Sequence, residues 1–479
     1  MQYLRMFLVA ALIPGALGAQ AAAPQTGMES VPFRLAGMEL ELTVDYGRQW
    51  LDGRATLTVE NWTDRPAPEL TVAVGRLMQV ETVTGPDGAP LPFHQEVTAF
   101  QDWTLRQANF VYVELPGPVA PGDSVPVTVT YAGHLVGATE TGMRYVQDHI
   151  DPAFTVLRAE AFAFPQVTGP SMASTRTVPR RTFPFSARVT VPETLVVATG
   201  GETVNRTTAD GRATYDVRSR RPVPFLNMTI APYEVYEHGG IRLYLFPEDT
   251  ARGPELLQTV TRALDWFRAR YGELPRAPAF SLMEIPDGYG SQAHLDAGIM
   301  IEASALAPEE SRAHLYHELS HFWNAPDAET PSPRWNEGLA MYLQERVAME
   351  LDGSDLGRAQ AAMARSVCRR ARESEAVRTT PLEAYGKADM TRWSYSVGAV
   401  LFHVLDGVMG SAALDRAYRG LYQAEKSGTV SVQELEAAFT RVEPRTQAVF
   451  DEWVHTAEWY DTLCVEHGGH LDAVMAGYR

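Results

Sequence analysis

The sequence predicts a multidomain protein of the α and β class, with an N-terminal antiparallel β-sandwich or saddle of sheets followed by an α+β domain rich in helices. The chain has 479 residues, and at roughly 100–200 residues per domain this length corresponds to two or three domains. Short β-rich runs separated by turn residues extend from about 33 to 237, and helical periodicity dominates beyond 308. With 45% hydrophobic and 21% charged residues, the chain can form substantial packed cores.

The first residues are typical of a secretory signal. Arg5 precedes an apolar run from Met6 to about Leu17, and small residues follow it. Pro14 interrupts this run, which is shorter than the roughly 20 residues that span a bilayer. We therefore expect residues 1–23 to be a signal peptide, removed on export to the periplasm or the exterior of a bacterial cell, with no transmembrane segment left after cleavage.

Residues 24–238 are predicted to form the β domain. Alternating runs such as MELELTVDY and FPFSARVTVP are typical of half-buried strands, and Asp210-Gly211 is typical of a tight reversal between two of them. The pattern changes after Gly240, where strands are expected at 241–246, 279–286 and 297–306 and a helix at 254–272. We therefore place a second domain at residues 239–479.

The net charge argues against a nucleic-acid partner, and the cysteine content allows at most one disulfide within the chain. The formal net charge is −18, and the basic residues are scattered, so the sequence lacks the basic stripe that binding to nucleic acid requires. Cys368 and Cys464 are the only cysteines. In an oxidising compartment they could form a disulfide, and two buried free thiols are the alternative. Neither the oligomeric state nor this pairing follows from the sequence.

A helix beginning near Pro308 carries the motif H-E-x-x-H. His317 and His321 are four residues apart, so on a helix both side chains lie on one face and can hold a single cation between them. Glu318 follows the first histidine and can point at a water molecule bound to that cation. This spacing predicts one zinc ion per chain, with Glu318 as general base and acid.

A third ligand is expected from the next helix, which should begin at Ser332-Pro333. Catalytic zinc takes three protein side chains and keeps one position for water, and two histidines with one glutamate are an established set. Glu337, 16 residues after His321, is the candidate. The alternative is that Glu337 only stabilises the start of its helix, as acidic residues do.

The segments HELSHFW and WNEGLAMY resemble the gluzincin zinc metallopeptidases of the alanyl-aminopeptidase family. The resemblance extends to RWSYSVGAVLFHVL, which is similar to the family's Y-x-K-G helix and places Tyr395 on its catalytic tyrosine, although Val397 stands where the family has lysine. It implies a thermolysin-like catalytic domain, peptide substrates and a short form without the family's large C-terminal helical domain. In this role the Tyr395 hydroxyl stabilises the oxyanion of the reaction; the alternative is an aromatic residue of the core.

One departure from that family concerns specificity. Its G-x-M-E-N strand binds the peptide backbone and, through its glutamate, the free amine, whereas here Gly290, Ser291 and Gln292 stand near these positions. A neutral amide cannot make the charge-assisted bond to ammonium that a carboxylate makes. Three acidic residues are candidates for a replacement charge: Glu284, Asp296 and Glu302. The plain alternative is that the glycines form only a turn after a strand.

The resemblance implies an exported zinc metallopeptidase, with aminopeptidase as the first expectation. Peptidase activity of another specificity is an alternative, since the M-E-N residues are missing and H-x-W-N is also similar to the glycyl-aminopeptidase family. A binding or assembly protein that keeps the scaffold without turnover is the alternative of another class.

Overall fold

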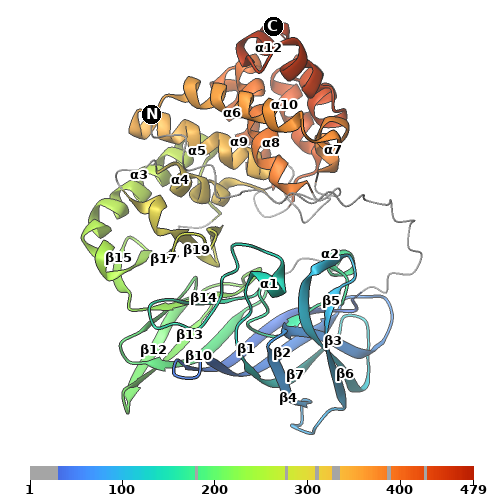
Figure 1. The fold of residues 1–479 in the computed structure, drawn as a ribbon, viewed down its shortest axis with the longest axis vertical. Coiled ribbons are helices and arrows are strands. Elements are labelled where there is room, and N and C mark those ends of the chain that lie inside the picture. Colours follow the sequence, from blue (N-terminus) through green and yellow to red (C-terminus); the bar gives the residue numbers. More distant parts are fainter. Residues whose placement is uncertain are drawn as a thin grey trace.

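The computed structural model describes residues 31–177, 182–275, 279–307, 312–325, 335–385, 390–425 and 429–478. The expected signal peptide at residues 1–23 and the expected helix start at Ser332-Pro333 lie outside the described residues. Figure 1 shows the N-terminal β domain, in blue and green, at one end of the molecule and the orange and red helices at the other end. The predicted order of a β domain followed by a helix-rich domain is therefore confirmed.

The N-terminal domain contains three sheets among the described residues. The seven-stranded sheet has the order β12 (Glu202–Ala209), β13 (Arg212–Arg218), β10 (Phe185–Pro192), β1 (Phe33–Asp45), β2 (Trp50–Asn61), β7 (Ser124–Gly133) and β4 (Met78–Thr84). The four-stranded sheet has the order β5 (Phe93–Phe100), β6 (Trp103–Val119), β3 (Ala67–Gly75) and β9 (Gln166–Val167). The three-stranded sheet has the order β11 (Val196–Thr199), β14 (Asn227–Ala231) and β8 (Thr155–Arg158).

Alternation of apolar and polar residues decides which face of each strand is buried. In β10, Phe185, Ala187 and Val189 are buried, whereas Ser186 and Arg188 between them are exposed. Side chains with a period of two lie on one face of a strand, so this pattern directs the apolar set into the core. The strands pair antiparallel, as predicted, with one exception: β1 pairs parallel to β10, which the long connection between these two strands allows.

The second domain is built on a mixed five-stranded sheet. Its order is β15 (Glu234–His238), β16 (Ile241–Leu245), β17 (Phe280–Ile285), β19 (Gly298–Glu302) and β18 (Gln292–His294). The pairs β16–β17 and β17–β19 are parallel, and β18 pairs antiparallel to β19 at the edge. Because β15 pairs with β16, this sheet begins on the N-terminal side of the domain boundary expected at residue 238.

The two domains pack closely at a turn beside this edge. A Cβ atom on Gly200 would lie 2.0 Å from the carbonyl carbon of Ala297, so the backbones of the domains touch there. An apolar cluster spans the same junction, with Phe154 and Val156 from the β domain against Met283 and Tyr289 of the second domain. The junction therefore holds the N-terminal domain against the edge of the second sheet.

Helices complete the second domain. The longer ones are α3 (Gly253–Tyr271), α4 (Ala313–Ser320), α5 (Asn336–Asp352), α6 (Leu356–Ala371), α8 (Thr391–Met409), α9 (Ser411–Glu425), α10 (Val432–Val442) and α12 (Leu471–Gly477). Its short helical segments are α7 (Glu375–Thr379), α11 (Thr446–Phe450), η2 (Pro247–Arg252), η3 (Ala303–Leu306), η4 (His321–Trp323), η5 (Leu382–Ala384), η6 (Asp451–His455) and η7 (Asp461–Glu466), whereas α1 (Ala138–Thr141) and α2 (Met172–Thr177) belong to the N-terminal domain. Helix α8 is central, because Val397, Val400 and Leu401 are fully buried in its core-facing side.

The two cysteines form a disulfide. Cys368 on α6 and Cys464 on η7 are joined, with 5.2 Å between their Cα atoms. Of the two alternatives left open by the sequence, the structure shows the bridged form. Within the described residues, no single helix has both the length and the apolar composition to cross a membrane; only the bent pair 392–409 and 411–424 meets those two criteria together.

Candidate metal centre

The H-E-x-x-H motif lies at the C-terminal end of α4, as predicted. His317 is on the helix, and His321 caps its end and begins the 3₁₀ turn η4. Their ring centroids are 5.0 Å apart. The helical spacing therefore places both imidazoles on one side of the segment, where they can share a cation.

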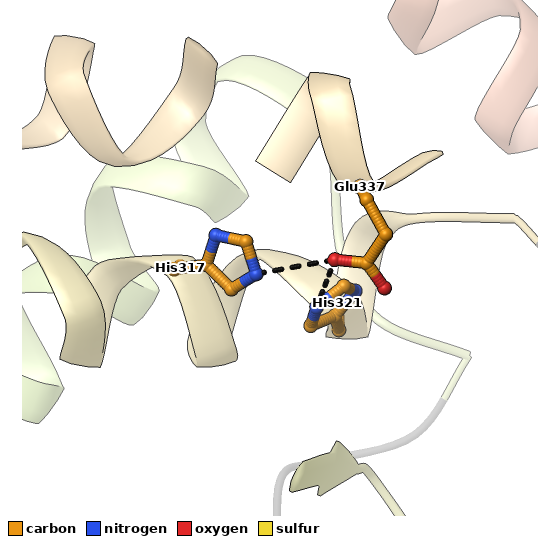
Figure 2. Close-up of side chains that lie close together, drawn as sticks. All are labelled: His317, His321 and Glu337. Atoms are coloured by element: carbon orange, nitrogen blue, oxygen red, sulfur yellow. Dashed lines mark ion pairs between the residues drawn. The ribbon is translucent and has the colours of Figure 1, made fainter. Parts of the chain in front are cut away.

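Glu337 joins the two histidines from the first turn of α5, which packs against α4. Its Oε2 atom lies 3.3 Å from Nε2 of His317 and 3.6 Å from Nε2 of His321, as the dashed lines in Figure 2 show. One ligand atom from each residue lies within 4.8 Å of the other two, so the group could hold a metal ion. Oε2 of Glu337 is buried and accepts no hydrogen bond, and two nitrogens and one oxygen suit zinc. The residues present therefore fit the ion that the sequence predicts.

Electrostatics keep the glutamate ionised. Burial acts to raise the pKa of Glu337, but the neighbouring His321 and His317 and the Tyr395 hydroxyl together lower it to about 2. On the far side of the ring, Nδ1 of His317 lies 3.1 Å from Oε1 of Gln344. An amide oxygen can only accept, so Nδ1 donates and Nε2 keeps its lone pair for a metal. Sequence reasoning missed Gln344, which lies seven residues after Glu337, about two turns further along the same helix, and carries no motif of its own.

Glu318 and Tyr395 lie beside this group. Glu318 is buried, and its Oε1 atom is 3.3 Å from Nε2 of His314. Tyr395, on α8, is partly exposed; its ring is nearly parallel to that of His317, with 6.2 Å between the ring centroids, and its hydroxyl lies near the Glu337 carboxylate. Burial, followed by the nearby carboxylates, raises the pKa of Tyr395 well above its usual value, so the hydroxyl keeps its proton near neutral pH.

The glycine-containing segment predicted to bind substrate leads into the edge strand β18. Gly290 has a φ of +72°, and a Cβ atom on it would lie 3.0 Å from the ring of Tyr145 in the N-terminal domain. The Ser291 hydroxyl accepts a hydrogen bond from the Glu302 amide at 3.1 Å. Gln292 is the first residue of β18, which lies against α4 and η4. The free edge of the sheet therefore lies next to the histidines.

Each of the three acidic residues considered as a replacement charge is either buried or held by a partner within the protein. Glu302 accepts hydrogen bonds from the amides of Gly288 and Gly290, and Glu284 is fully buried in strand β17. Asp296 lies 3.6 Å from Arg221. Their positions indicate structural roles.

A fourth carboxylate, Glu160 of the N-terminal domain, reaches the edge strand instead. Its Oε1 atom accepts a hydrogen bond from Nε2 of Gln292 at 2.5 Å, and its Oε2 atom accepts one from the Tyr145 hydroxyl at 3.3 Å. Tyr145 is close enough to Tyr395 to influence its pKa. Sequence reasoning missed Glu160, because the surrounding run AEAFAFPQ carries no ligand spacing and lies 132 residues before Gln292.

Comparison with solved structures shows where this architecture recurs. The M1 zinc metallopeptidase from Deinococcus radiodurans aligns with a TM-score of 0.64 and 21% identity, over 89% of this chain and 97% of that one. A mutant M1 zinc metallopeptidase from the same organism, bound to a Tyr-Ser-Ala substrate, aligns with a TM-score of 0.64 and 20% identity over the same shares. Native yeast LTA4 hydrolase aligns with a TM-score of 0.64 and 15% identity, over 89% of this chain and 68% of that one. No protein-family model and no curated protein matches the sequence.

These likenesses define the class of fold as that of the M1 zinc metallopeptidases. The chain is similar over nearly its whole described length to the two-domain form, and a two-domain M1 zinc metallopeptidase mutant bound to L-tryptophan aligns over 98% of its own chain at 21% identity and a TM-score of 0.64. The fold implied by the HELSHFW and WNEGLAMY segments is thus confirmed.

Proposed function

We propose that this protein is a zinc-dependent metallopeptidase that removes residues from the amino terminus of peptides. The observation that carries the proposal is the convergence of His317, His321 and Glu337 on one point, with Glu318 and Tyr395 beside it. Solved structures of the same fold support it, since they include an M1 zinc metallopeptidase bound to the peptide Tyr-Ser-Ala.

His317, His321 and Glu337 would hold one zinc ion. When bound, zinc supplies Lewis-acid chemistry: it acidifies water and polarises a carbonyl group. Glu318 accepts a proton from the attacking water and transfers it to the departing amine. The Tyr395 hydroxyl, protonated near neutral pH, donates a hydrogen bond to the oxygen on which negative charge develops.

Aminopeptidase specificity is supported by the position of Glu160. Its carboxylate is partly exposed, with 29% of the side chain accessible, and lies at the edge strand β18. An ammonium group at the start of a peptide makes its strongest hydrogen bonds to a carboxylate. Gln292 favours this arrangement, because its amide donates to Glu160, whereas a glutamate at this position would repel it.

Metal analysis and paired reporter peptides test the proposal. The purified protein is expected to contain one zinc ion per chain, to lose activity to a chelator and to regain it with zinc. Alanyl nitroanilide should be hydrolysed and N-acetyl-alanyl nitroanilide should not, and Glu160→Gln should remove this preference. Zinc without turnover would favour a binding protein, and equal hydrolysis of blocked and free reporters would exclude an aminopeptidase.

We further propose that the mature protein is exported. The disulfide between Cys368 and Cys464 supports this location, because disulfides persist in oxidising compartments. Amino-terminal sequencing of the protein from the periplasmic fraction and the medium should find a start between Gln20 and Pro24. A start at Met1 in the cytoplasmic fraction alone would contradict export.

A further inference from the structure

A fully buried arginine lies directly behind Glu160. Arg158, at the end of β8, has no exposed side-chain surface. Its Nε atom is 3.1 Å from Oδ1 of Asp148, whose side chain is 1% exposed, and its Nη1 atom is 3.7 Å from Oε1 of Glu160. One buried cation is thus shared between a buried carboxylate and a carboxylate that faces the site.

Two aromatic rings also lie near this cation. The guanidinium carbon lies 5.8 Å from the ring of Tyr145 and 5.9 Å from the ring of Tyr289. Nε, Nη1 and Nη2 of Arg158 make no hydrogen bond of good geometry within the described residues. The interaction of Arg158 with the two carboxylates is therefore mainly the attraction between charges, and no directed hydrogen bond holds the guanidinium to one carboxylate alone.

This arrangement sets up a competition for Glu160. The positive charge of Arg158 attracts the same carboxylate that a substrate ammonium group would bind. A second anion on the other side of the guanidinium compensates that charge and leaves more of the negative potential of Glu160 for the ammonium group. Asp148 occupies this second place, and another arginine near Glu160, Arg106, donates to its backbone carbonyl at 2.8 Å.

We propose that Asp148 is a positioning residue for substrate recognition: it neutralises Arg158 from behind, so that Glu160 is available to the ammonium group of a peptide. The inference rests on the proposed function, in which Glu160 binds that group. Burial raises the pKa of Asp148 to about 7, against the opposing pull of the Arg158 charge. Asp148 is therefore mostly ionised above neutral pH, and it neutralises the charge of Arg158 most strongly there.

The test compares variants of the zinc-loaded enzyme with alanyl nitroanilide at pH 7.5, where most of Asp148 and most of the substrate amine are ionised. Asp148→Asn should raise KM by about tenfold, the size of a typical charge-assisted interaction, with kcat within about twofold of wild type. The double variant Asp148→Asn/Arg158→Met removes cation and anion together, and its KM should return to the wild-type value or below. Asp151→Asn, which makes the same change three residues away, is the matched control and should leave KM unchanged.

Three results would overturn the inference. An unchanged KM in Asp148→Asn would do so, as would an equally raised KM in the double variant, which would indicate a structural defect. The third is a KM difference between wild type and Asp148→Asn that is as large at pH 6 as at pH 7.5. If Asp148→Asn does not fold, the double variant decides alone, since a KM above wild type contradicts the charge argument.

Failure of the proposed function gives a different pattern. If Glu160→Gln affects free and N-acetylated reporters alike, Glu160 does not bind the amine. If Glu160→Gln lowers the preference for the free amine while Asp148→Asn leaves it intact, the proposed function stands and the inference about Asp148 is wrong.

Discussion

Gly338 of α5 packs directly on Gly398 of α8. A Cβ atom on Gly338 would lie 2.4 Å from the Cα atom of Gly398, a distance that real side chains do not reach. The close approach lets α8, which carries Tyr395, lie next to the helix that carries Glu337. The proximity of Tyr395 to Glu337 thus depends on the close approach of two glycines.

Gly338→Ala is expected to force these helices apart. Overpacking of this kind costs about 1–3 kcal/mol, so the melting temperature should fall, and kcat should fall with it because Tyr395 moves. Gly420→Ala is the matched control on α9, where an added Cβ meets nothing within 4 Å; it should be neutral or stabilise by up to about 1 kcal/mol. Calorimetry and reporter hydrolysis measure both effects, and equal stability of the two variants would contradict the packing argument.

Glu318→Gln should lower kcat by about 10²–10⁴-fold, because the amide cannot accept the proton of the attacking water. Zinc content, measured by atomic absorption, should stay at the wild-type value, since Glu318 is not among the three ligands. Glu337→Gln is the contrasting variant and should weaken zinc binding itself. Full activity in Glu318→Gln would refute the role of general base.

Tyr395→Phe removes one hydroxyl from the site and keeps the ring beside His317. Loss of a single oxyanion donor costs about 10²–10³-fold in kcat, and KM should change little. Tyr112→Phe, on the surface of the β domain, is the control for the same deletion and should leave both constants unchanged. A rise in KM without a fall in kcat would place the Tyr395 hydroxyl in substrate binding instead.

The disulfide contributes to the stability of the helical part. It closes a loop between residues 96 positions apart, and removing such a bridge typically costs about 2–5 kcal/mol. The double variant Cys368→Ser/Cys464→Ser should therefore unfold at a lower urea concentration than wild type. Reducing the disulfide of the wild-type protein should shift its unfolding midpoint by the same amount, whereas the same treatment should not shift the midpoint of the variant. An unchanged midpoint in the double variant would show that packing alone holds α6 and η7 together.

Glu284 should make the stability depend on pH. Burial raises its pKa to about 8, although the Phe246 amide donates a hydrogen bond to it at 2.7 Å. The folded state then holds a proton that the unfolded state releases near 4.5, so stability falls as pH rises from about 4.5 to 8, by at most about 1.4 kcal/mol per pH unit. Glu284→Gln should flatten this slope in urea titrations at several pH values, and an identical slope in variant and wild type would contradict it.

Local spacing in the sequence predicted that three side chains would converge, and the structure places His317, His321 and Glu337 where they could hold a metal ion. His317 and His321 meet because a helix returns every fourth residue to the same face, and Glu337 comes from the start of the following helix, one connection away. The catalytic role expected of Tyr395 came only from the resemblance to the alanyl-aminopeptidase family, since nothing in the apolar pattern of its helix distinguishes it from an aromatic residue of the core. The partly exposed position of its ring beside His317 is a product of helix packing.

By itself the sequence determined the order of a β domain and a helix-rich domain, the strand faces and the two imidazoles on one side of α4, because periodicity and i, i+4 spacing are properties of the local chain. Only the tertiary structure decided which carboxylate reaches β18, how α5 and α8 approach at Gly338, and that Cys368 joins Cys464. These contacts join segments far apart in the chain, and their partners are chosen by the packing of whole elements.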